Sequence, residues 1–394
     1  MMRKMFSWLL VLCLLLPASI AAAEETVIPE IELRILDIPD NEAMTHLRRM
    51  GTGWNLGNTF DATGGSWIKN HMEIEKAWTG HYVNRELIQS VARAGFGFIR
   101  IPVSWHDHVD ESFTIYPEWL DRVQEVADWA LAEGLYVIVN THHDNEKDFY
   151  YPDSAHLESS KKYLTAIWQQ MAERFRDYDD HLMLESLNEP RLKDTPMEWN
   201  FSADNAECRD AASVINTLNQ LFVDTVRATG GNNATRYLCV PGYDGSPANT
   251  GDGVFSLPKD SAENRIIVSA HAYTPYDFAL KPDGGKDFSW NNNGQRMDIL
   301  GNIGALYDRF ISKGIPAIMD ECGCVDRNGN LQARVEWCAG YAAAARSRGV
   351  PIAWWDNGAL HTTGENFAIF NRVNGEMFFP EIVEALLKYR LPAP

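Results

Sequence analysis

The sequence has no cluster or stripe of basic residues, and its acidic residues clearly outnumber its basic ones. Among 394 residues there are 35 Lys and Arg against 54 Asp and Glu, which gives a formal net charge of −19. Nucleic acids and anionic membrane surfaces bind basic patches, so neither is expected as a partner. An acidic surface is compatible with a neutral polymer substrate, but the charge alone does not identify one.

Cysteine is scarce, with 6 in the whole chain. Five of them follow the cleavage site predicted below: Cys208, Cys239, Cys322, Cys324 and Cys338. An odd number argues against a complete disulfide framework. Cys322 and Cys324 are spaced too tightly for an ordinary structural zinc site. We therefore expect thiols that are wholly or partly free beside a functional strand.

Long apolar runs are also missing. The run from Leu9 to Leu16 is far shorter than the roughly 20 residues that span a bilayer. Arg3 and Lys4 precede it, and small residues follow it up to Ala23. This order is typical of a signal peptide, which we predict to be residues 1–23 and to be cleaved near its last alanine. We expect a secreted, monomeric protein, either extracellular or periplasmic.

The rest of the chain has no Ser/Thr/Pro-rich linker, low-complexity tract or short repeat, so residues 24–394 are predicted to form one catalytic domain. Short apolar runs alternate with helical patterns, as in parallel strands buried on both faces. The expected strands are Gly53–Leu56, Phe98–Val103, Tyr136–Asn140, Leu182–Leu187, Tyr237–Pro241, Ile266–Ala270, Ala317–Met319 and Ile352–Trp355. The expected helices include Glu86–Ala94, Glu118–Ala132, Ser160–Phe175, Ala211–Ala228, Arg296–Ser312 and Ala333–Ser347. This alternation predicts an α/β fold, a closed (β/α)₈ TIM barrel.

An open doubly wound sheet is the alternative fold. Such a sheet normally carries a glycine-rich phosphate loop after its first strand. Here the glycine-containing segment Gly51–Trp54 precedes the strand instead. This order favours the barrel.

Two acidic segments, Leu184–Pro190 and Ile318–Gly323, each consist of a short apolar run that leads to a glutamate and then a turn residue. In a barrel, Glu189 and Glu321 would reach the C-terminal ends of their strands, where barrel enzymes have their active sites. Two carboxyl groups placed there could cleave a glycosidic bond. The alternative is that each glutamate only caps the helix that follows it.

Polar or aromatic residues occur at most of the predicted strand ends, which converge on one face of a barrel. They are Asn55, Asn58, Arg100, His106, His142, His143, Asn188, Glu189, His271, Tyr273, Glu321 and Trp355. Arg100 is flanked by apolar residues and must find an anion, because a buried unpaired charge is very costly. Its partner is either a structural acid or a catalytic carboxylate that the guanidinium keeps ionised.

Seven stretches occur in order along nearly the whole mature chain. They are Gly53–Asn58, Ile99–Trp105, Asn140–Asp144, Leu187–Pro190, His271–Tyr276, Asp320–Glu321 and Trp354–Gly358. Together they resemble glycoside hydrolase family 5, the cellulase-type barrels. The resemblance implies a retaining endo-β-1,4-glucanase that needs no metal or organic cofactor, with Glu189 as acid/base and Glu321 as nucleophile. It further implies support from Arg100, His142, Asn188, His271, Tyr273 and Trp355.

These implied roles agree with the chemistry of the side chains. Asn188 can hydrogen-bond a sugar 2-hydroxyl, and Tyr273 and Arg100 can donate to Glu321 and keep it charged. His271 could set the charge state of Glu189, although a histidine satisfied within the core is equally expected. Trp355 offers its face to a sugar ring, whereas its neighbour in the strand should point the other way.

One position departs from the family pattern. The family usually has an aromatic residue after the nucleophile, where this chain has Cys322. The change should alter local packing and weakens inferences about the sugar subsites. It removes no chemical group that the mechanism needs.

Four tryptophans, Trp67, Trp78, Trp199 and Trp290, fall in predicted loops after strand ends and could stack on sugar rings. Ordinary packing is the alternative for each of them. Together they suggest a long cleft and cleavage inside a β-glucan polymer. The motifs most resemble the endo-β-1,4-glucanase branch, with xyloglucan or mixed-linkage β-glucan as alternative substrates and mannan as a less favoured one.

Two other classes of function stay open. His142, His143 and Asp144, with Glu189, His271 or Glu321, could bind a metal in a metal-dependent barrel hydrolase. Adjacent histidines at a strand end are expected to point apart, which argues against that site. A carbohydrate-binding barrel without activity is the other alternative, and it is disfavoured because both glutamates are present.

Overall fold

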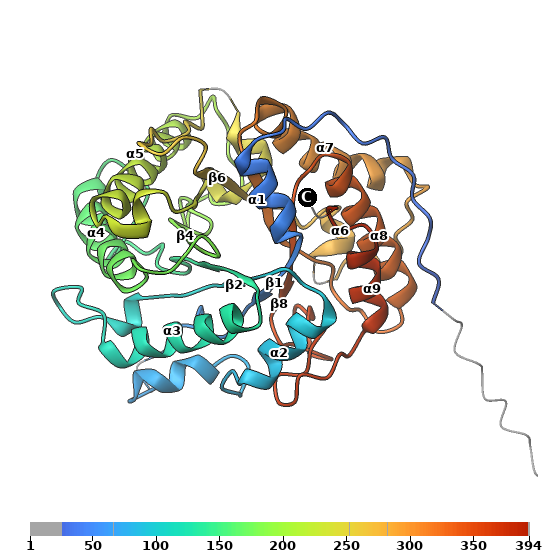
Figure 1. Ribbon diagram of the computed structural model, residues 1–394, viewed down its shortest axis with the longest axis horizontal. Helices are drawn as coiled ribbons and strands as arrows, with labels where there is room; N and C mark the ends of the chain where they lie inside the picture. Colours follow the sequence, from blue (N-terminus) through green and yellow to red (C-terminus); the bar gives the residue numbers. More distant parts are fainter. Residues whose placement is uncertain (1–25, 66, 252, 282, 393–394) are drawn as a thin grey trace, which may run out of the picture.

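The computed structural model describes residues 26–65, 67–251, 253–281 and 283–392, so the predicted signal peptide lies outside the described residues. In the described part of the chain, strands β1 to β8 pair in sequence order and close into a parallel barrel (Figure 1). The strands are β1 Thr52–Leu56, β2 Phe98–Ile101, β3 Tyr136–Val139, β4 Leu182–Glu185, β5 Leu238–Pro241, β6 Ile266–His271, β7 Ala317–Cys322 and β8 Ile352–Asp356. This confirms the predicted TIM barrel and rules out the open sheet.

The helices surround the barrel (Figure 1). They are α1 Glu42–Met50, α2 Arg85–Ala94, α3 Pro117–Ala132, α4 Leu157–Arg174, α5 Ala206–Ala228, α6 Tyr276–Ala279, α7 Asn293–Arg309, α8 Leu331–Ser347 and α9 Pro380–Lys388. Asparagine side chains begin several of them: Asn84 accepts from the Leu87 amide of α2, and Asn292 accepts from the first amides of α7. These caps supply acceptors that the first turn of a helix otherwise lacks.

Helix α1, which the sequence patterns did not reveal, lies across the end of the barrel where the strands begin (Figure 1). Its residues Met44, Leu47 and Met50 are buried. His46 of α1 stacks on Tyr237 with ring centroids 3.9 Å apart, and burial lowers its pKa to about 3. The ring is therefore neutral near pH 7, and α1 closes the barrel opposite the predicted active-site face.

Several strands end earlier than the sequence predicted. Strand β3 ends at Val139 and β4 at Glu185, so the polar residues that follow lie in loops above the barrel. Strand β7 is longer than predicted, and its pairing is irregular next to both β6 and β8. A register shift of this kind re-aims side chains that would otherwise alternate between the two faces of a sheet. Two consecutive acids of β7, Asp320 and Glu321, both approach Arg100.

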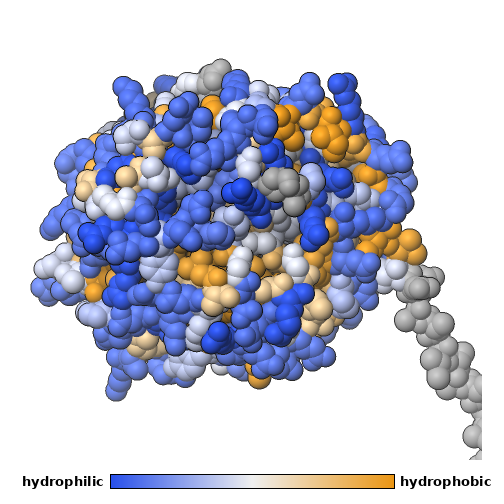
Figure 2. All heavy atoms as spheres, in the orientation of Figure 1, coloured by the Kyte–Doolittle hydropathy of each residue, from blue (hydrophilic) through white to orange (hydrophobic). Residues whose placement is uncertain are grey.

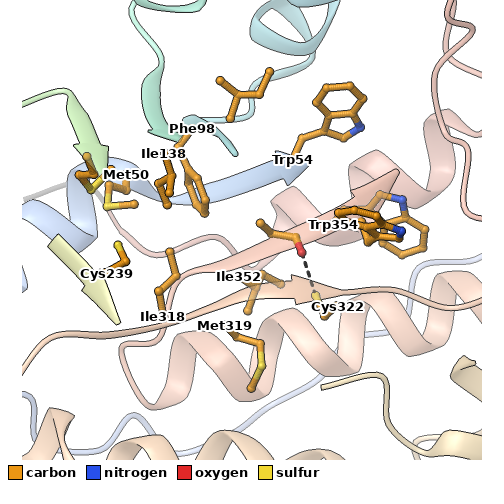
Figure 3. Packing of buried hydrophobic residues seen from close by; sticks show 14 of the residues in the cluster. Met50, Trp54, Phe98, Ile138, Cys239, Ile318, Met319, Cys322, Ile352 and Trp354 are labelled. Atoms are coloured by element: carbon orange, nitrogen blue, oxygen red, sulfur yellow. Dashed lines mark hydrogen bonds between the residues drawn. The ribbon is translucent and has the colours of Figure 1, made fainter. Parts of the chain in front are cut away.

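The core is continuous from the strands to the surrounding helices, and Figure 3 shows part of it. Cys322 is fully buried there, and its thiol donates to the Ala353 carbonyl at 3.4 Å. The face drawn in Figure 2 is largely hydrophilic, with smaller separate hydrophobic patches. Within the described ranges, every helix is either too short or too polar to cross a membrane.

Candidate active site

The C-terminal ends of β2, β4, β6 and β7 bring Arg100, Glu189, His271 and Glu321 together. Glu321 belongs to β7, whereas Glu189 lies in the loop four residues beyond the end of β4. One oxygen of each of these two carboxyl groups and one ring nitrogen of His271 lie within 4.8 Å of one another. The Glu189 side chain is 18% exposed and that of Glu321 only 5%, so both are reachable from one side of a largely dry site.

Glu321 accepts hydrogen bonds at both of its oxygens. Arg100 Nη1 donates to Oε1 at 2.6 Å, and the Tyr273 hydroxyl donates to Oε2 at 3.0 Å. His271 Nδ1 is 3.6 Å from Oε2. Burial raises the pKa of the Glu321 carboxyl above its ordinary value, and the charges of His271 and Arg100 oppose that rise. The predicted donors to Glu321 are therefore both in place.

Glu189 is tied to His271 and stands near Arg191. Its Oε1 is 2.9 Å from His271 Nδ1, and its Oε2 is 3.8 Å from Arg191 Nη1. Burial acts to raise the pKa of Glu189, but the hydrogen bond and charge of His271, aided by Arg191, outweigh it and lower the pKa. Burial acts to lower the pKa of His271, yet Glu321, Glu189 and Asp320 raise it to about 9. Near neutral pH the Glu189–His271 pair thus holds a proton, mainly on the imidazole.

Arg100 unites the two alternatives raised by the sequence, because it contacts a structural acid and the predicted nucleophile at once. Its Nε donates to Glu185 at 2.7 Å, and Nη1 donates to Glu321. Asn55 lies within β1 and is fully buried, so it supports Arg100 by accepting from Nη1 at 3.2 Å and does not face the open site. The sequence placed Asn55 at a strand end, and in the structure it lies one residue before the last residue of β1.

Asn188 is oriented by Arg100. Arg100 Nη2 donates to Asn188 Oδ1 at 2.8 Å. This contact occupies the amide oxygen and leaves the amide nitrogen as the donor for anything bound above Glu189. The predicted sugar contact through Asn188 would therefore be a donated hydrogen bond.

His142 is a neutral imidazole whose tautomer can be worked out from its neighbours. The Val103 amide donates to Asn140 Oδ1 at 3.0 Å, so Asn140 presents its amide nitrogen to His142 Nδ1, 3.1 Å away. His142 Nδ1 is then the acceptor and Nε2 carries the hydrogen. Burial, followed by the charges of His143 and Arg100, lowers the pKa of His142 well below its usual range.

His142 and His143 do not point apart, contrary to the sequence-based expectation. Their ring centroids are 4.4 Å apart, and one atom each of Asp61, His142 and His143 lie within 4.8 Å of one another. The expectation failed because both residues follow the end of β3 and lie outside the regular strand. They line a pocket of about 220 Å³ together with Thr63, Trp78, His106, Asn145, Glu146, Arg191 and Lys193.

The two tryptophans of β8 occupy different environments. Trp355 lies parallel to His142, with ring centroids 5.7 Å apart and planes within 2°. Trp354 packs against Trp337 of α8, and its indole donates to the Phe367 carbonyl at 2.9 Å. Trp355 is therefore the member of the pair at the site, where the sequence placed it.

Comparison with known proteins identifies the family. The model of the family described as cellulase, glycosyl hydrolase family 5, matches residues 59–361. The chain belongs to glycoside hydrolase family 5. It is therefore a glycoside hydrolase, as the sequence motifs indicated.

Relatives of this family-5 hydrolase include enzymes named endoglucanase. Endoglucanase B of Ruminococcus albus is 39% identical over 86% of this chain and 79% of its own length. A family-5 lichenase from Caldicellulosiruptor, solved with cellotetraose, is 49% identical, with a TM-score of 0.91 over 93% of this chain and all of that one. A broad-specificity endoglucanase from Ruminococcus champanellensis, solved with cellotriose, is 39% identical, with a TM-score of 0.82 over 89% of this chain and all of that one.

The four loop tryptophans of this family-5 hydrolase are not equivalent. Trp67, Trp78 and Trp199 are 80%, 44% and 56% exposed. Trp199 stacks under Arg191, and Trp78 is 5.6 Å from His143 between ring centroids. Trp290 instead packs against Gly340 of α8, where a side chain at position 340 would meet its ring. Trp290 is therefore a packing residue and not an exposed platform.

Sequence reasoning missed Glu185, Asp320 and Asn140 as members of the site. Glu185 and Asp320 are fully buried beside Arg100, at 2.7 and 3.6 Å. A charged residue inside an apolar strand was the available signal for both acids. Cys322 directly follows Glu321, and all five cysteines of the described residues are buried and free.

Proposed function

We propose that this hydrolase is a secreted, retaining endo-β-1,4-glucanase in which Glu189 is the acid/base and Glu321 the nucleophile. The observation that carries the proposal is the close approach of the two carboxyl groups, with one oxygen of each within 4.8 Å. Retaining glycosidases place these groups about 5–5.5 Å apart, whereas inverting enzymes leave room for a water between them. The short separation supports double displacement.

In the first step, a Glu321 oxygen attacks the anomeric carbon while Glu189 gives a proton to the departing sugar oxygen. The Glu189–His271 contact at 2.9 Å keeps that proton available, because the imidazole can return it to the carboxylate. In the second step, Glu189 takes a proton from water, and the water oxygen displaces Glu321 from the sugar. Glu189 must be protonated and Glu321 ionised when the first step begins. Glu189 must be ionised when the second step begins, while Glu321 is bound to the sugar.

The surrounding groups support this charge arrangement. Arg100 and Tyr273 donate to Glu321 while it is an anion, and they hold its oxygens in a fixed orientation for attack. The Asn188 amide nitrogen is free to donate to the sugar 2-hydroxyl, a contact that strengthens in the transition state. Trp355 and neutral His142 form a flat, uncharged wall for the sugar ring.

The substrate we propose is a polymer with a β-1,4-glucan backbone, cut at internal bonds. Exposed Trp67, Trp78 and Trp199 support a cleft longer than one sugar. The similarity to a lichenase and to broad-specificity endoglucanases favours mixed-linkage β-glucan alongside unbranched β-1,4-glucan. Xyloglucan comes next and mannan last. Initial rates on a panel of these four soluble polymers would rank them, and turnover of mannan alone would contradict the proposal.

The decisive experiment separates the two glutamates by role. Glu189→Ala should nearly abolish polymer cleavage, because the leaving oxygen receives no proton. It should keep substantial turnover of substrates with an aryl leaving group that needs no acid. Added azide should then accelerate the second step and yield the β-glycosyl azide, since azide replaces the water that Glu189 activates.

Glu321→Ala should lose both activities, because no covalent intermediate can form. Azide should attack directly in this variant and yield the α-glycosyl azide from a β-linked substrate. Swapped azide products would reverse the assignment of acid and nucleophile. Full activity in both variants would place the active site elsewhere.

A metal-dependent reaction is the second candidate, because Asp61, His142 and His143 converge beside the surface that Trp355 and His142 form. Two imidazoles and one carboxylate are ligands suited to zinc. Dialysis against a chelator should leave the rate on β-glucan unchanged if the two glutamates perform the chemistry. Loss of activity that Zn²⁺ restores would favour the metal reaction instead.

We also propose that the protein is exported and is a monomer. The basic start, apolar run and small residues within positions 1–23 support cleavage near Ala23. The first residues of protein recovered outside the cytoplasm should follow that position. Light scattering of the same protein should give the mass of one mature chain.

A further inference from the structure

Near the two glutamates, four buried polar atoms have no hydrogen-bond partner among the residues that the structure describes. They are Glu185 Oε1, His271 Nε2, and both carboxyl oxygens of Asp320. Leaving buried polar atoms unpaired costs free energy, and the cost is larger for charged groups. Four such atoms in one place indicate that these side chains hold an additional proton or hydrogen bond.

The unpaired atoms belong to three side chains that meet inside the barrel. One atom each of Glu185, His271 and Asp320 lie within 4.8 Å of one another. His271 Nε2 is 3.5 Å from Asp320 Oδ1, and Arg100 Nε is 3.6 Å from Asp320 Oδ2. The arrangement is possible because the irregular pairing of β7 turns Asp320 as well as Glu321 toward Arg100.

The charges in this region do not balance if every acid is ionised. Glu185, Asp320 and Glu321 surround the single guanidinium of Arg100, and Glu189 is the fourth acid against His271. Two thiols also lie near Asp320, Cys239 of β5 and Cys322 of β7, and burial raises the pKa of both well above the ordinary value, so both are uncharged. Asn55 of β1 donates to the Asp320 backbone carbonyl at 2.8 Å and to the Trp354 carbonyl at 3.2 Å, and not to the Asp320 carboxyl group. A further cation, Arg191, lies 3.8 Å from Glu189, but it is shared with Glu198 at 3.1 Å. Three acids around one guanidinium in a dry interior therefore require an added proton.

We propose that Asp320 carries this proton and links Glu185, His271 and Glu189 into one buried hydrogen-bonded chain. Protonated Asp320 donates to Glu185 Oε1, directly or through one water, and its other oxygen accepts from His271 Nε2. His271 Nδ1 in turn forms a hydrogen bond with Glu189. This single assignment satisfies all four unpaired atoms. Burial, followed by the charge of Glu185, raises the pKa of Asp320 well above its ordinary value, in agreement with the assignment.

The chain gives Asp320 a role in the proposed reaction, and this inference rests on the proposed function. Asp320 does not reach the substrate, so it is a positioning residue that acts through His271. It fixes the imidazole with Nε2 inward and Nδ1 toward Glu189. Because it is neutral, it also leaves the charge of Arg100 to Glu185 and Glu321.

Asp320→Asn tests the assignment, because an asparagine imitates a permanently protonated aspartate. Its amide nitrogen can donate to Glu185 and its oxygen can accept from His271. We expect kcat/KM within about threefold of wild type and an unchanged alkaline limb of the pH profile. Asp320→Ala leaves both neighbours unpaired and should lower kcat by about tenfold. Melting temperatures of both variants verify that they fold.

The matched control is Glu185→Gln, which makes the same change of acid to amide on the other side of the shared proton. It removes the anion that Arg100 Nε contacts at 2.7 Å and should therefore reduce kcat more than Asp320→Asn does. If Asp320 were ionised, Asp320→Asn would remove a negative charge next to His271. The alkaline limb would then move by about one pH unit or more toward acid, which would overturn the proposal. Tolerance of Glu185→Gln but not Asp320→Asn would also overturn it by placing the proton on Glu185.

Infrared difference spectroscopy tests the proton without any activity measurement. Wild type minus Asp320→Asn should show the carbonyl stretch of a protonated carboxylic acid at neutral pH. A difference band of an ionised carboxylate would contradict the inference even in a fully active enzyme. Absence of glucanase activity in the wild type would instead refute the proposed function and leave the infrared result valid.

Discussion

His142 and His271 both lie at strand ends of the same barrel, yet their surroundings leave His142 neutral and make His271 positively charged. His271 faces the carboxyl groups of Glu321 and Glu189, and its pKa is raised to about 9 although the ring is buried. His142 has no carboxylate in hydrogen-bond contact; Asn140 fixes its tautomer, and burial keeps its pKa well below the usual range. The difference teaches that the placement of carboxylates decides the charge of a histidine here.

This contrast divides the site into two sides. The carboxylate side consists of Arg100, Glu185, Glu189, His271, Asp320 and Glu321. The aromatic side consists of Trp78, His142, His143 and Trp355. The carboxylate side holds protons and charge and is suited to bond cleavage, whereas the aromatic side is neutral and flat and is suited to holding a sugar. Variants that remove a charge or a hydrogen-bond partner from the first side should change kcat, whereas Asp320→Asn keeps both hydrogen bonds and should not. Variants of the second side should change KM.

The largest expected effect comes from Arg100→Ala, which leaves the carboxylate side without its central cation. Glu185 and Glu321 would become unpaired buried acids, and Glu321 would take up a proton near neutral pH. We expect kcat to fall on the order of 10²–10³-fold on every substrate. The free energy of unfolding should fall by about 3–5 kcal/mol, as when one partner of a buried ion pair is removed.

Arg100→Lys is the control for this variant, because it keeps the charge but cannot contact Glu185, Glu321 and Asn188 at the same time. It should recover much of the stability and little of the activity. Steady-state kinetics and thermal unfolding measure the two effects separately. Near-normal kcat in Arg100→Ala would show that the cation is not needed for the reaction.

An intermediate effect is expected from removing the charge at position 271, so that positions 142 and 271 are both neutral. His271→Gln removes the proton-holding partner of Glu189, so kcat should fall roughly tenfold to hundredfold. In the wild type, activity should be present while the Glu189–His271 pair is protonated and be lost as the pH rises through about 9. The acid limb should reflect protonation of Glu321, whose pKa is raised. In His271→Gln the alkaline limb should move to lower pH.

His142→Gln serves as the matched variant on the aromatic side. Because His142 is already neutral, the alkaline limb should stay in place, and KM should rise more than kcat falls. The pH dependence of kcat/KM for both variants measures this directly. If His142→Gln moved the limb as far as His271→Gln does, the two sides would not be electrostatically distinct.

The barrel was predictable because its strands are continuous apolar runs separated by helical patterns. The strand ends were less predictable, since the residues after Val139 and Glu185 are also buried and read as further strand. Helix α1 was missed because it has only nine residues, and its apolar positions Met44, Leu47 and Met50 make a short repeat. Its burial depends on the open end of the barrel, which no local pattern reveals.

The site was predictable where a motif ends a strand and unpredictable where neighbouring strands decide the geometry. Glu189, Glu321 and Arg100 stand in recognisable segments. Asp320 stands in the same motif as Glu321, but its place in the site was not predictable, because regular alternation would turn it away from Glu321 and only the irregular pairing of β7 brings it inward. The tautomer of His142 depends on the Val103 amide, a contact made across strands.

The smallest expected effect concerns the edge of the aromatic side, at Trp78. Its ring is 44% exposed and lies 5.6 Å from the His143 ring, so it can stack on a sugar without supporting the core. Trp78→Ala should raise KM for a soluble β-glucan about two- to tenfold, since an aromatic contact is worth about 0.5–1.5 kcal/mol, and should leave kcat unchanged. Trp290→Ala is the control, because that ring packs on Gly340 and its backbone amide donates to Glu336 at 2.7 Å. It should lower the free energy of unfolding by about 1–3 kcal/mol and leave KM unchanged. A fall in kcat without a change in KM for Trp78→Ala would mean that the aromatic side takes part in bond cleavage.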